Sequence, residues 1–276
     1  MKKDREQILR ERNFWYGQTY ILFEIVKCLK NRELCFLTLK SEEKKKAVRY
    51  LLGFNIDYLK KHMAWFNTEK GLLNIYHSVA LLKPTVPVFS YNLKVRSRDE
   101  KYEEFNKNYS NYVEKYNFFL DIDGKEDFKL ALKEAKEIKK IFDEFKIPYY
   151  ILNSSFWGFH FVIPSEYMPD LDIIKLLETL NELLYNFIGI HDFKMVDETI
   201  VDLKRVQKCP YSYSCDGSIV LPLDDKQLQN FKQEMVVMQT VLKDVRIKDR
   251  GLLLRTHNLS KEELKKNVLK FIESYE

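Results

Sequence analysis

Apolar and polar positions repeat along this chain in two periods, which together predict a mixture of helices and strands. Residues 126–145 carry apolar side chains every three or four positions with lysines and glutamates opposite, and this predicts an amphipathic helix. Residues 170–189 predict a second helix by the same spacing. Short apolar runs between turn residues predict strands at 117–122, 147–152 and 159–164. The predicted apolar stripe of the first helix consists of Phe128, Ala131, Ala135, Ile138, Phe142 and Phe145.

The flanking parts of the chain show weaker patterns. The stretch that begins at Ser41 fits either a helix start or a charged hairpin tip before a strand at 47–52. Residues 96–115 are polar, charged and rich in Tyr and Asn, which predicts a surface connection. The remaining predicted elements are a helix over 4–30, strands over 33–40, 72–84 and 218–223, and a mostly helical end.

No repeat and no linker of low complexity interrupts the 276 residues. Mixed strands and helices without such a break predict one domain of the α/β (α+β) class. Within residues 1–276 we distinguish an N-terminal module (1–116), a core that carries the motifs described below (117–223) and a C-terminal, mainly helical segment (224–276).

Composition supports a folded chain with a substantial core. Hydrophobic residues make up 45%, including 19 Phe and 17 Tyr, which argues against disorder. The formal charge of +5, from 46 basic and 41 acidic residues, permits a nucleic-acid partner without requiring one. The longest stretch without Lys, Arg, Asp or Glu, residues 147–165, contains prolines, Asn153 and Gly158, so no membrane span is expected.

The four cysteines and the opening residues predict a reducing compartment. No two cysteines form a CxxC pair, so we expect free thiols and no structural zinc. The opening "MKKDREQILRER" is charged and does not resemble a secretory signal. A cytoplasmic location is therefore expected.

Two acidic residues, Asp121 and Asp123, lie at the end of the strand predicted at 117–122 and directly after it. Side chains alternate between the faces of a strand, so Asp121 and Asp123 point the same way, beside Phe119. Neighbouring like charges are costly unless a cation or another partner offsets them. The pair fits either a turn and helix N-cap or a divalent-metal site, because hard cations such as Mg²⁺ prefer carboxylate oxygens.

Two further clusters contain groups suited to phosphate. In "SSFWGFH", Ser154 and Gly158 precede His160, which fits either a buried core histidine or a loop that approaches a phosphate chain. In "VDETIVDLKRVQKCPYS", Asp197 and Asp202 precede a run of cations. That run fits either an exposed charged turn or a site for a metal-bound triphosphate.

Taken in this order, the clusters resemble the small catalytic subunit of the archaeal and eukaryotic DNA primases. "FFLDIDG" is similar to that family's DxD after a strand, "SSFWGFH" to its SxxxGxH, and "VDETIVDLKRVQKCPYS" to its aspartate, basic run and PxS element. The likeness extends to "NRELCFLTLK" with "AVRYLLGF", to "IYHSVALLKP" and to "LPLDDKQLQNF", and so covers residues 12–242. It implies the archaeo-eukaryotic primase fold, in which an RRM-like half carries the catalytic aspartates.

The resemblance also implies roles for individual residues. Asp121, Asp123 and Asp197 would be the catalytic carboxylates and would bind two Mg²⁺ or Mn²⁺ ions. The nucleotide-binding residues would be Ser154, His160, Arg49, Arg205 and Lys208.

The implied activity is that of a primase or primase-polymerase. It would carry out template-directed nucleotidyl transfer that makes short RNA or DNA primers on single-stranded DNA from NTPs or dNTPs. A primase large subunit or a helicase is a candidate partner, and no membrane is involved.

The sequence departs from the family pattern at several positions. Trp157 stands where the family has a basic residue, and Ser214 where it has a histidine. The interval from Asp197 to Pro210 is shorter than usual, which leaves Asp202 as an alternative third carboxylate. The family's cysteine-rich zinc element after the first motif is missing.

Two other functions remain open at this point. A DxD motif also occurs in metal-dependent glycosyltransferases, although that class leaves the third cluster without a role. A replication scaffold with a primase-like fold and no catalysis is the second alternative, favoured by Trp157 and Ser214.

Overall fold

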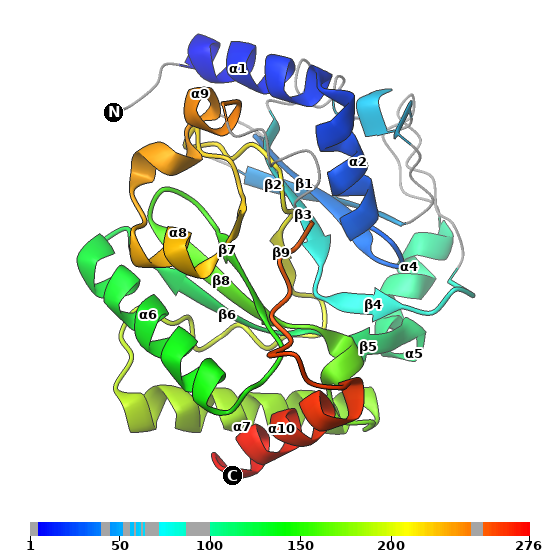
Figure 1. Ribbon diagram of the computed structural model, residues 1–276. Helices are drawn as coiled ribbons and strands as arrows, with labels where there is room; N and C mark the ends of the chain where they lie inside the picture. The colour runs from blue at the N-terminus through cyan, green and yellow to red at the C-terminus, as the bar shows by residue number, and fades with distance from the viewer. Residues whose placement is uncertain are drawn as a thin grey trace. The chain divides into compact units, whose positions relative to one another are not determined.

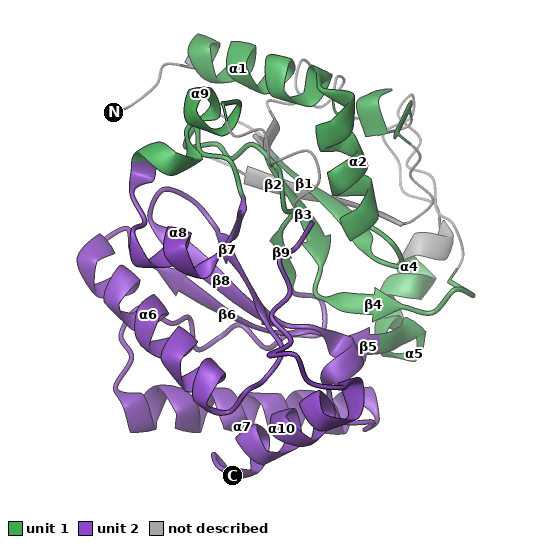
Figure 2. Cartoon of the chain, in the orientation of Figure 1, with its two compact units in different colours: residues 1–114, 206–220, 234–249 green, residues 115–205, 221–233, 250–276 purple. Residues whose placement is uncertain are grey.

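The computed structural model describes residues 5–39, 45–51, 56–57, 59–61, 63, 72–86, 100–243 and 251–276. The chain divides into two compact units, each built from three separate stretches (Figure 2). Unit 1 consists of residues 1–114, 206–220 and 234–249, and unit 2 of residues 115–205, 221–233 and 250–276. The predicted motif-bearing core therefore contributes to both units. That the chain forms a single catalytic domain stays a prediction.

Unit 1 has a four-stranded antiparallel sheet, in the order β2-β1-β3-β9. Its first two helices bury Trp15, Ile21 and Ile25, whereas Phe14 and Phe23 are exposed. Trp15 is fully buried, and its indole nitrogen donates to the carbonyl oxygen of Tyr211. A separate two-stranded sheet joins β4 to β5. The elements of unit 1, with the straddling β5, are α1 (Arg5–Gly17), α2 (Thr19–Cys28), β1 (Glu33–Leu39), β2 (Lys45–Leu51), β3 (Leu72–Ser78), β4 (Ala80–Leu82), α4 (Glu100–Lys107), α5 (Tyr109–Tyr112), β5 (Val113–Tyr116), β9 (Val206–Lys208) and α9 (Met238–Val241).

Several predictions about this unit are corrected. The single helix predicted over 4–30 is broken at Gln18, whose backbone is extended. Residues 45–51 form a strand that pairs antiparallel with β1, as the strand alternative predicted, and the proposed hairpin tip at 41–44 lies outside the described residues. The predicted surface connection contains α4 and α5, which bury Phe105 and Tyr109. Residues 96–99 of that connection lie outside the described part of the chain.

Unit 2 has a second four-stranded antiparallel sheet, in the order β10-β7-β8-β6. Figure 1 labels three of its strands, β7, β8 and β6. The strands and helices predicted between 117 and 189 are confirmed, whereas only 222–223 of the predicted strand over 218–223 forms one. The elements are β6 (Phe118–Asp123), α6 (Phe128–Glu144), β7 (Tyr150–Asn153), β8 (Gly158–Ile163), the 3-10 helix η1 (Ser165–Tyr167), α7 (Ile173–His191), β10 (Pro222–Leu223), α8 (Asp225–Gln229), the straddling 3-10 helix η2 (Gln233–Val236) and α10 (Lys261–Glu273).

The core of unit 2 follows the strand and helix order of an RRM. The chain runs β6, α6, β7, β8 and α7, and then Val196 forms a bridge with Ile122 on the free side of β6. Counting that bridging segment as the last strand gives the spatial order last-first-third-second, with helices after the first and third strands. This is a β-α-β-β-α-β unit, and it confirms the expected RRM-like half.

The helices of unit 2 pack on one face of this sheet. Phe142 of α6 contacts Phe161 of β8 at a ring-centroid distance of 5.8 Å, and it also contacts Phe187 of α7 and Phe271 of α10. Because side chains alternate along a strand, the neighbours of Phe161 point to the opposite face. His160 and its cross-strand partner Asp121 therefore lie on the face away from these helices.

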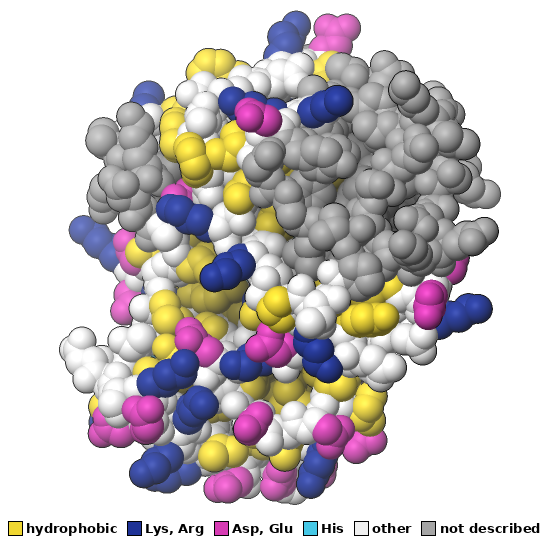
Figure 3. All heavy atoms as spheres, turned by 90° about the vertical axis from the view of Figure 1, so that its right-hand side faces the viewer, with side chains coloured by type: hydrophobic (Ala, Val, Ile, Leu, Met, Phe, Trp, Pro, Cys, Tyr) yellow, Lys and Arg dark blue, Asp and Glu magenta, His cyan; other side chains and the backbone are white. Residues whose placement is uncertain are grey.

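No helix in the described ranges combines the length and the apolar character that crossing a membrane requires. On the face shown in Figure 3, basic and acidic side chains are interspersed, and no broad area of one charge stands out among the described residues. This mixture agrees with the small net charge of +5.

Candidate active site

Asp121 and Asp123 lie on the same face at the end of β6, as the alternation predicted. The side chain of Asp121 is 28% exposed and that of Asp123 is 57% exposed. Asp121 lies opposite His160 on β8, and Asp123 lies opposite Gly158. Solvent therefore reaches both carboxylates, and β8 supplies their neighbours along the sheet.

Asp197 is brought beside this pair by backbone hydrogen bonds. Its amide donates to the carbonyl oxygen of Asp121 at 2.8 Å, and the amide of Asp123 donates to the carbonyl oxygen of Met195 at 2.9 Å. The segment 195–197 thus extends the sheet at β6. Asp197 is far from Asp121 in sequence. The backbone hydrogen bond between them brings the first and third sequence motifs together.

Each of the three aspartates has a basic neighbour. Nε2 of His160 lies 3.3 Å from Oδ1 of Asp121, and Nζ of Lys125 lies 3.7 Å from Oδ2 of Asp123. Nη2 of Arg205 lies 2.6 Å from Oδ2 of Asp197. The two cations, Lys125 and Arg205, offset part of the repulsion among like charges that the sequence pattern raised.

Both carboxylate oxygens of Asp197 have hydrogen-bond partners. Its Oδ1 accepts hydrogen bonds from the amide and the hydroxyl of Thr199, at 2.9 and 2.7 Å. Burial alone would raise the pKa of Asp197, but the hydrogen bonds from Thr199 and the ion pair with Arg205 outweigh it and lower that pKa. The carboxylate is therefore held in its charged form.

His160 is almost fully buried. Its ring meets that of Phe119 edge to face at a centroid distance of 5.6 Å, and its Nδ1 has no hydrogen-bond partner among the described residues. The sequence left open a buried core histidine or a residue of a phosphate-binding loop. The structure shows a buried side chain that also faces Asp121. Its predicted role in holding a triphosphate stays a prediction.

Ser154 begins the four-residue loop between β7 and β8, and Gly158 follows it. The amide of Ser154 donates to the carbonyl oxygen of Gly158 at 2.9 Å. A Cβ at Gly158 would lie 2.5 Å from Oγ of Ser154 and 2.6 Å from the carbonyl oxygen of Ile122, closer than real Cβ contacts allow. The glycine of this motif is thus required by the close approach of the loop to β6.

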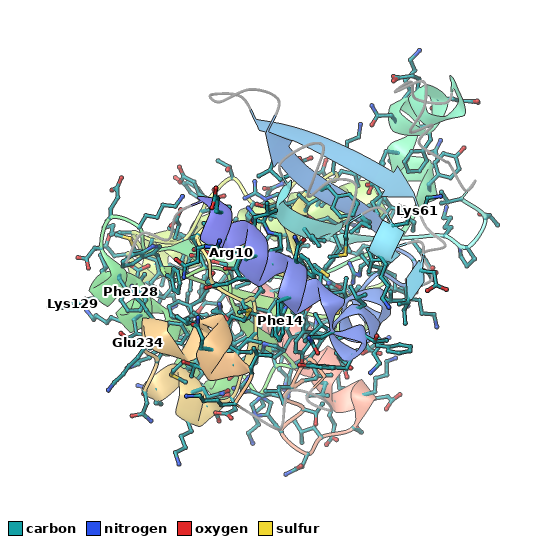
Figure 4. The ribbon with its side chains drawn as sticks, turned by 90° about the horizontal axis from the view of Figure 1, so that it is seen from above. Arg10, Phe14, Lys61, Phe128, Lys129 and Glu234 are labelled. Atoms are coloured by element: carbon teal, nitrogen blue, oxygen red, sulfur yellow. The ribbon has the colours of Figure 1, made fainter. Side chains whose placement is uncertain are left out.

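Trp157 lies in the same loop and is tied to the residue after the aspartate pair. Its carbonyl oxygen accepts from the amide of Gly124 at 2.9 Å, and its own amide donates to Oγ of Ser155. The indole is 37% exposed and meets the ring of Phe128 edge to face, at a centroid distance of 6.0 Å. Figure 4 shows Phe128 and Lys129 at the start of α6.

The remaining predicted nucleotide-binding residues, Arg49 and Lys208, belong to unit 1. Arg49 lies on β2 opposite Cys35, and its side chain is outside the described part of the structure. Nζ of Lys208 donates to Oγ of Ser214 at 3.3 Å, and that hydroxyl donates to Oδ1 of Asn74. Ser214, which stands where the resembled sequence pattern has a histidine, therefore contacts Lys208.

Sequence reasoning missed two residues of this site, Thr199 and Glu134. Glu134 is 4% exposed although glutamates were predicted on the outer face of its helix. Its carboxylate accepts from the amides of Lys194 and Met195. A signal was present, since Glu134 stands three residues after Ala131 and four before Ile138, which places it on the apolar stripe.

The aspartate pair fits a hard divalent cation by its chemistry, because it offers two partly exposed carboxylates on one sheet face. Within the described ranges, no three His, Cys, Asp or Glu side chains already converge as a ligand set. Both oxygens of Asp197 are engaged by Thr199 and Arg205. A third carboxylate ligand would therefore become available when that ion pair opens.

Comparisons with known proteins identify a solved structure with a similar fold. No family model matches the chain, and no curated protein does. Among solved structures, the chain is similar to the polymerase domain of ligase D from Mycobacterium tuberculosis in complex with DNA. The TM-score is 0.53 at 10% identity, over 91% of this chain and 93% of that one.

A second solved structure, primase RepB′, gives a TM-score of 0.39 at 9% identity, over 83% of this chain and 67% of that one. The ligase D polymerase domain is the more similar of these two structures, with a TM-score above 0.5. Together with the β-α-β-β-α-β core of unit 2, that likeness establishes the architecture. The chain has the fold of this polymerase domain.

Proposed function

We propose that this protein is a primase or primase-polymerase, which transfers nucleotides to a 3′-hydroxyl under the direction of a single-stranded DNA template. The observation that carries the proposal is the alignment of Asp121 and Asp123 on β6 with Asp197 hydrogen-bonded beside them. The fold shared with a polymerase domain supports it.

Asp121, Asp123 and Asp197 would hold Mg²⁺ or Mn²⁺, which when bound would activate the 3′-hydroxyl and neutralise the triphosphate. The protein's own residues would bind and orient the reactants, since phosphoryl transfer depends on positioning and charge stabilisation. Arg205 would leave Asp197 and pair with the triphosphate, because a guanidinium binds phosphate oxygens in the same way as it binds a carboxylate. Ser154, His160, Arg49 and Lys208 are the other proposed nucleotide-binding residues.

The first test is synthesis on single-stranded DNA with labelled NTPs and dNTPs supplied separately, in Mg²⁺ or Mn²⁺. We expect labelled products whose composition follows the template, with release of pyrophosphate. A glycosyltransferase would instead release a nucleoside diphosphate from a sugar nucleotide, and an inactive scaffold would bind DNA without incorporating label. Either of those results would contradict the proposal.

Trp157 provides a separate prediction, on nucleotide binding. We propose that the partly exposed indole of Trp157 stacks on a base or sugar and is held in place by its contact with the ring of Phe128. Stacking on an aromatic side chain contributes about 1–3 kcal/mol per base. Trp157→Ala should therefore raise the Michaelis constant for nucleotide by about tenfold, whereas Trp157→Phe should have little effect.

Two further variants sharpen that test. Tyr185→Ala removes an exposed aromatic side chain from α7 and should leave the Michaelis constant unchanged. Trp157→Arg restores the basic residue of the family pattern, and we expect no gain from it. If Trp157→Arg instead lowers the Michaelis constant by about tenfold, the site lacks one cation and the stacking proposal is wrong.

A further inference from the structure

Glu134 is a buried carboxylate whose hydrogen-bond partners in the described ranges are backbone amides of one short segment. It lies on α6 and is 4% exposed. Its Oε1 accepts from the amide of Lys194 at 2.8 Å, and its Oε2 accepts from the amide of Met195 at 2.9 Å. Burying a carboxylate is costly unless it is hydrogen-bonded. Two successive amides satisfy that requirement here.

The segment held by Glu134 leads directly to Asp197. Past Met195, whose carbonyl oxygen accepts from the amide of Asp123, Val196 bridges Ile122. The amide of Asp197 then donates to the carbonyl oxygen of Asp121. Residues 194–197 are therefore held by Glu134 at one end and by β6 at the other, entirely within unit 2.

We propose that Glu134 is a positioning residue for the third carboxylate of the site. This inference rests on the proposed function. A ligand must be held within about 0.5 Å of its working position, and residue 197 lies on a connection between α7 and β9. The two hydrogen bonds that Glu134 accepts fix the beginning of that segment, where Met195 also accepts from the amide of Asp123. Through them, α6 determines where Asp197 meets Asp121.

The proposal requires a carboxylate at this position. Both oxygens of Glu134 accept hydrogen bonds, and both partners are donors. A glutamine would offer one acceptor, and its amide group would face the other donor. Glu134→Gln therefore keeps the size of the side chain and removes one of the two bonds.

The experiment compares Glu134→Gln with Glu137→Gln, an exposed glutamate on the same helix. Mn²⁺ affinity is measured by electron paramagnetic resonance, and hydrogen exchange is followed at the amides of 194–197. We expect Glu134→Gln to bind Mn²⁺ about 10- to 100-fold more weakly, as variants of residues that orient metal ligands generally do, and to exchange faster at these amides. Raising Mn²⁺ should restore incorporation. Glu137→Gln should behave as the wild type does.

Unchanged Mn²⁺ affinity and unchanged exchange in Glu134→Gln would overturn the proposal. If that variant does not fold, Glu134→Asp keeps both oxygens and shortens their reach, and an unchanged Mn²⁺ affinity there would overturn it equally. Asp121→Asn separates this inference from the proposed function. If Asp121→Asn also binds Mn²⁺ normally, the metal site itself is wrong. If Asp121→Asn loses Mn²⁺ and Glu134→Gln does not, only the role of Glu134 fails.

Discussion

Asp121→Asn and Asp123→Asn are each expected to reduce nucleotide incorporation by at least about 100-fold at matched metal concentration. A metal ion contributes several kcal/mol of charge stabilisation to the transition state, and each 1.36 kcal/mol corresponds to about tenfold in rate. An amide retains the shape of the carboxylate but loses its charge. The measurement is single-turnover incorporation of labelled nucleotide with Mn²⁺ held constant.

These substitutions should leave the fold intact. The aspartates are partly exposed, and the ion pair of Asp123 with Lys125 is 3.7 Å long in a largely exposed setting. Exposed pairs of this kind contribute about 0–1 kcal/mol, so the free energy of unfolding of Asp123→Asn should change by no more than about that amount. Asp170→Asn, at an exposed aspartate before α7, is the matched control. Near-normal incorporation by either site variant would eliminate the metal-site interpretation.

The second large effect concerns the choice between Asp197 and Asp202. The structure places Asp197 beside Asp121 by a backbone hydrogen bond. The carboxylate of Asp202 instead accepts from the amide of Lys204, its near neighbour in sequence, at 3.2 Å. We therefore expect Asp197→Ala to lose at least about 100-fold in incorporation, while Asp202→Ala stays within a few-fold of the wild type.

The contacts of Asp202 explain the expected difference. Its carbonyl oxygen accepts from the hydroxyl of Tyr116 and from the amide of Arg205, and both bonds survive in Asp202→Ala because they use the backbone. The bond to Lys204 is lost, at a cost of about 0.5–1.5 kcal/mol in unfolding free energy. If Asp202→Ala proves to be the inactive variant, the third motif has been assigned to the wrong aspartate.

The centre of the chain was predictable because its patterns are strong and local. The strand ending at Asp123 and the helix α6 follow from alternation and from helical spacing over many residues. The helices α4 and α5 were missed because few apolar side chains mark their buried face, chiefly Phe105 and Tyr109. Whether such a segment forms a helix depends on its packing against the rest of the fold, which a short polar pattern does not reveal.

The residues of the candidate site stay a prediction, and the contacts among them could not be predicted from the sequence. Sequence motifs singled out Asp121, Asp197 and Arg205, but nothing local indicates that Arg205 pairs with Asp197 or that residues 195–197 extend the sheet beside β6. Pairing between segments distant in sequence depends on the whole fold. For Glu134, the sequence spacing was enough to predict burial on the apolar stripe of α6, but it did not indicate the amides that its carboxylate would bind.

The division of the chain into two units has a consequence for how the protein is made. Each unit is assembled from three stretches that alternate along the sequence. Unit 1 lacks residues 234–249, and unit 2 lacks residues 250–276, until these have left the ribosome. Domains generally fold one after another during synthesis, and this chain cannot complete either unit early. Because each unit consists of three separate stretches, neither can be obtained as a contiguous fragment. A shortened chain that stops before α10 would also lose Phe271 from the core of unit 2.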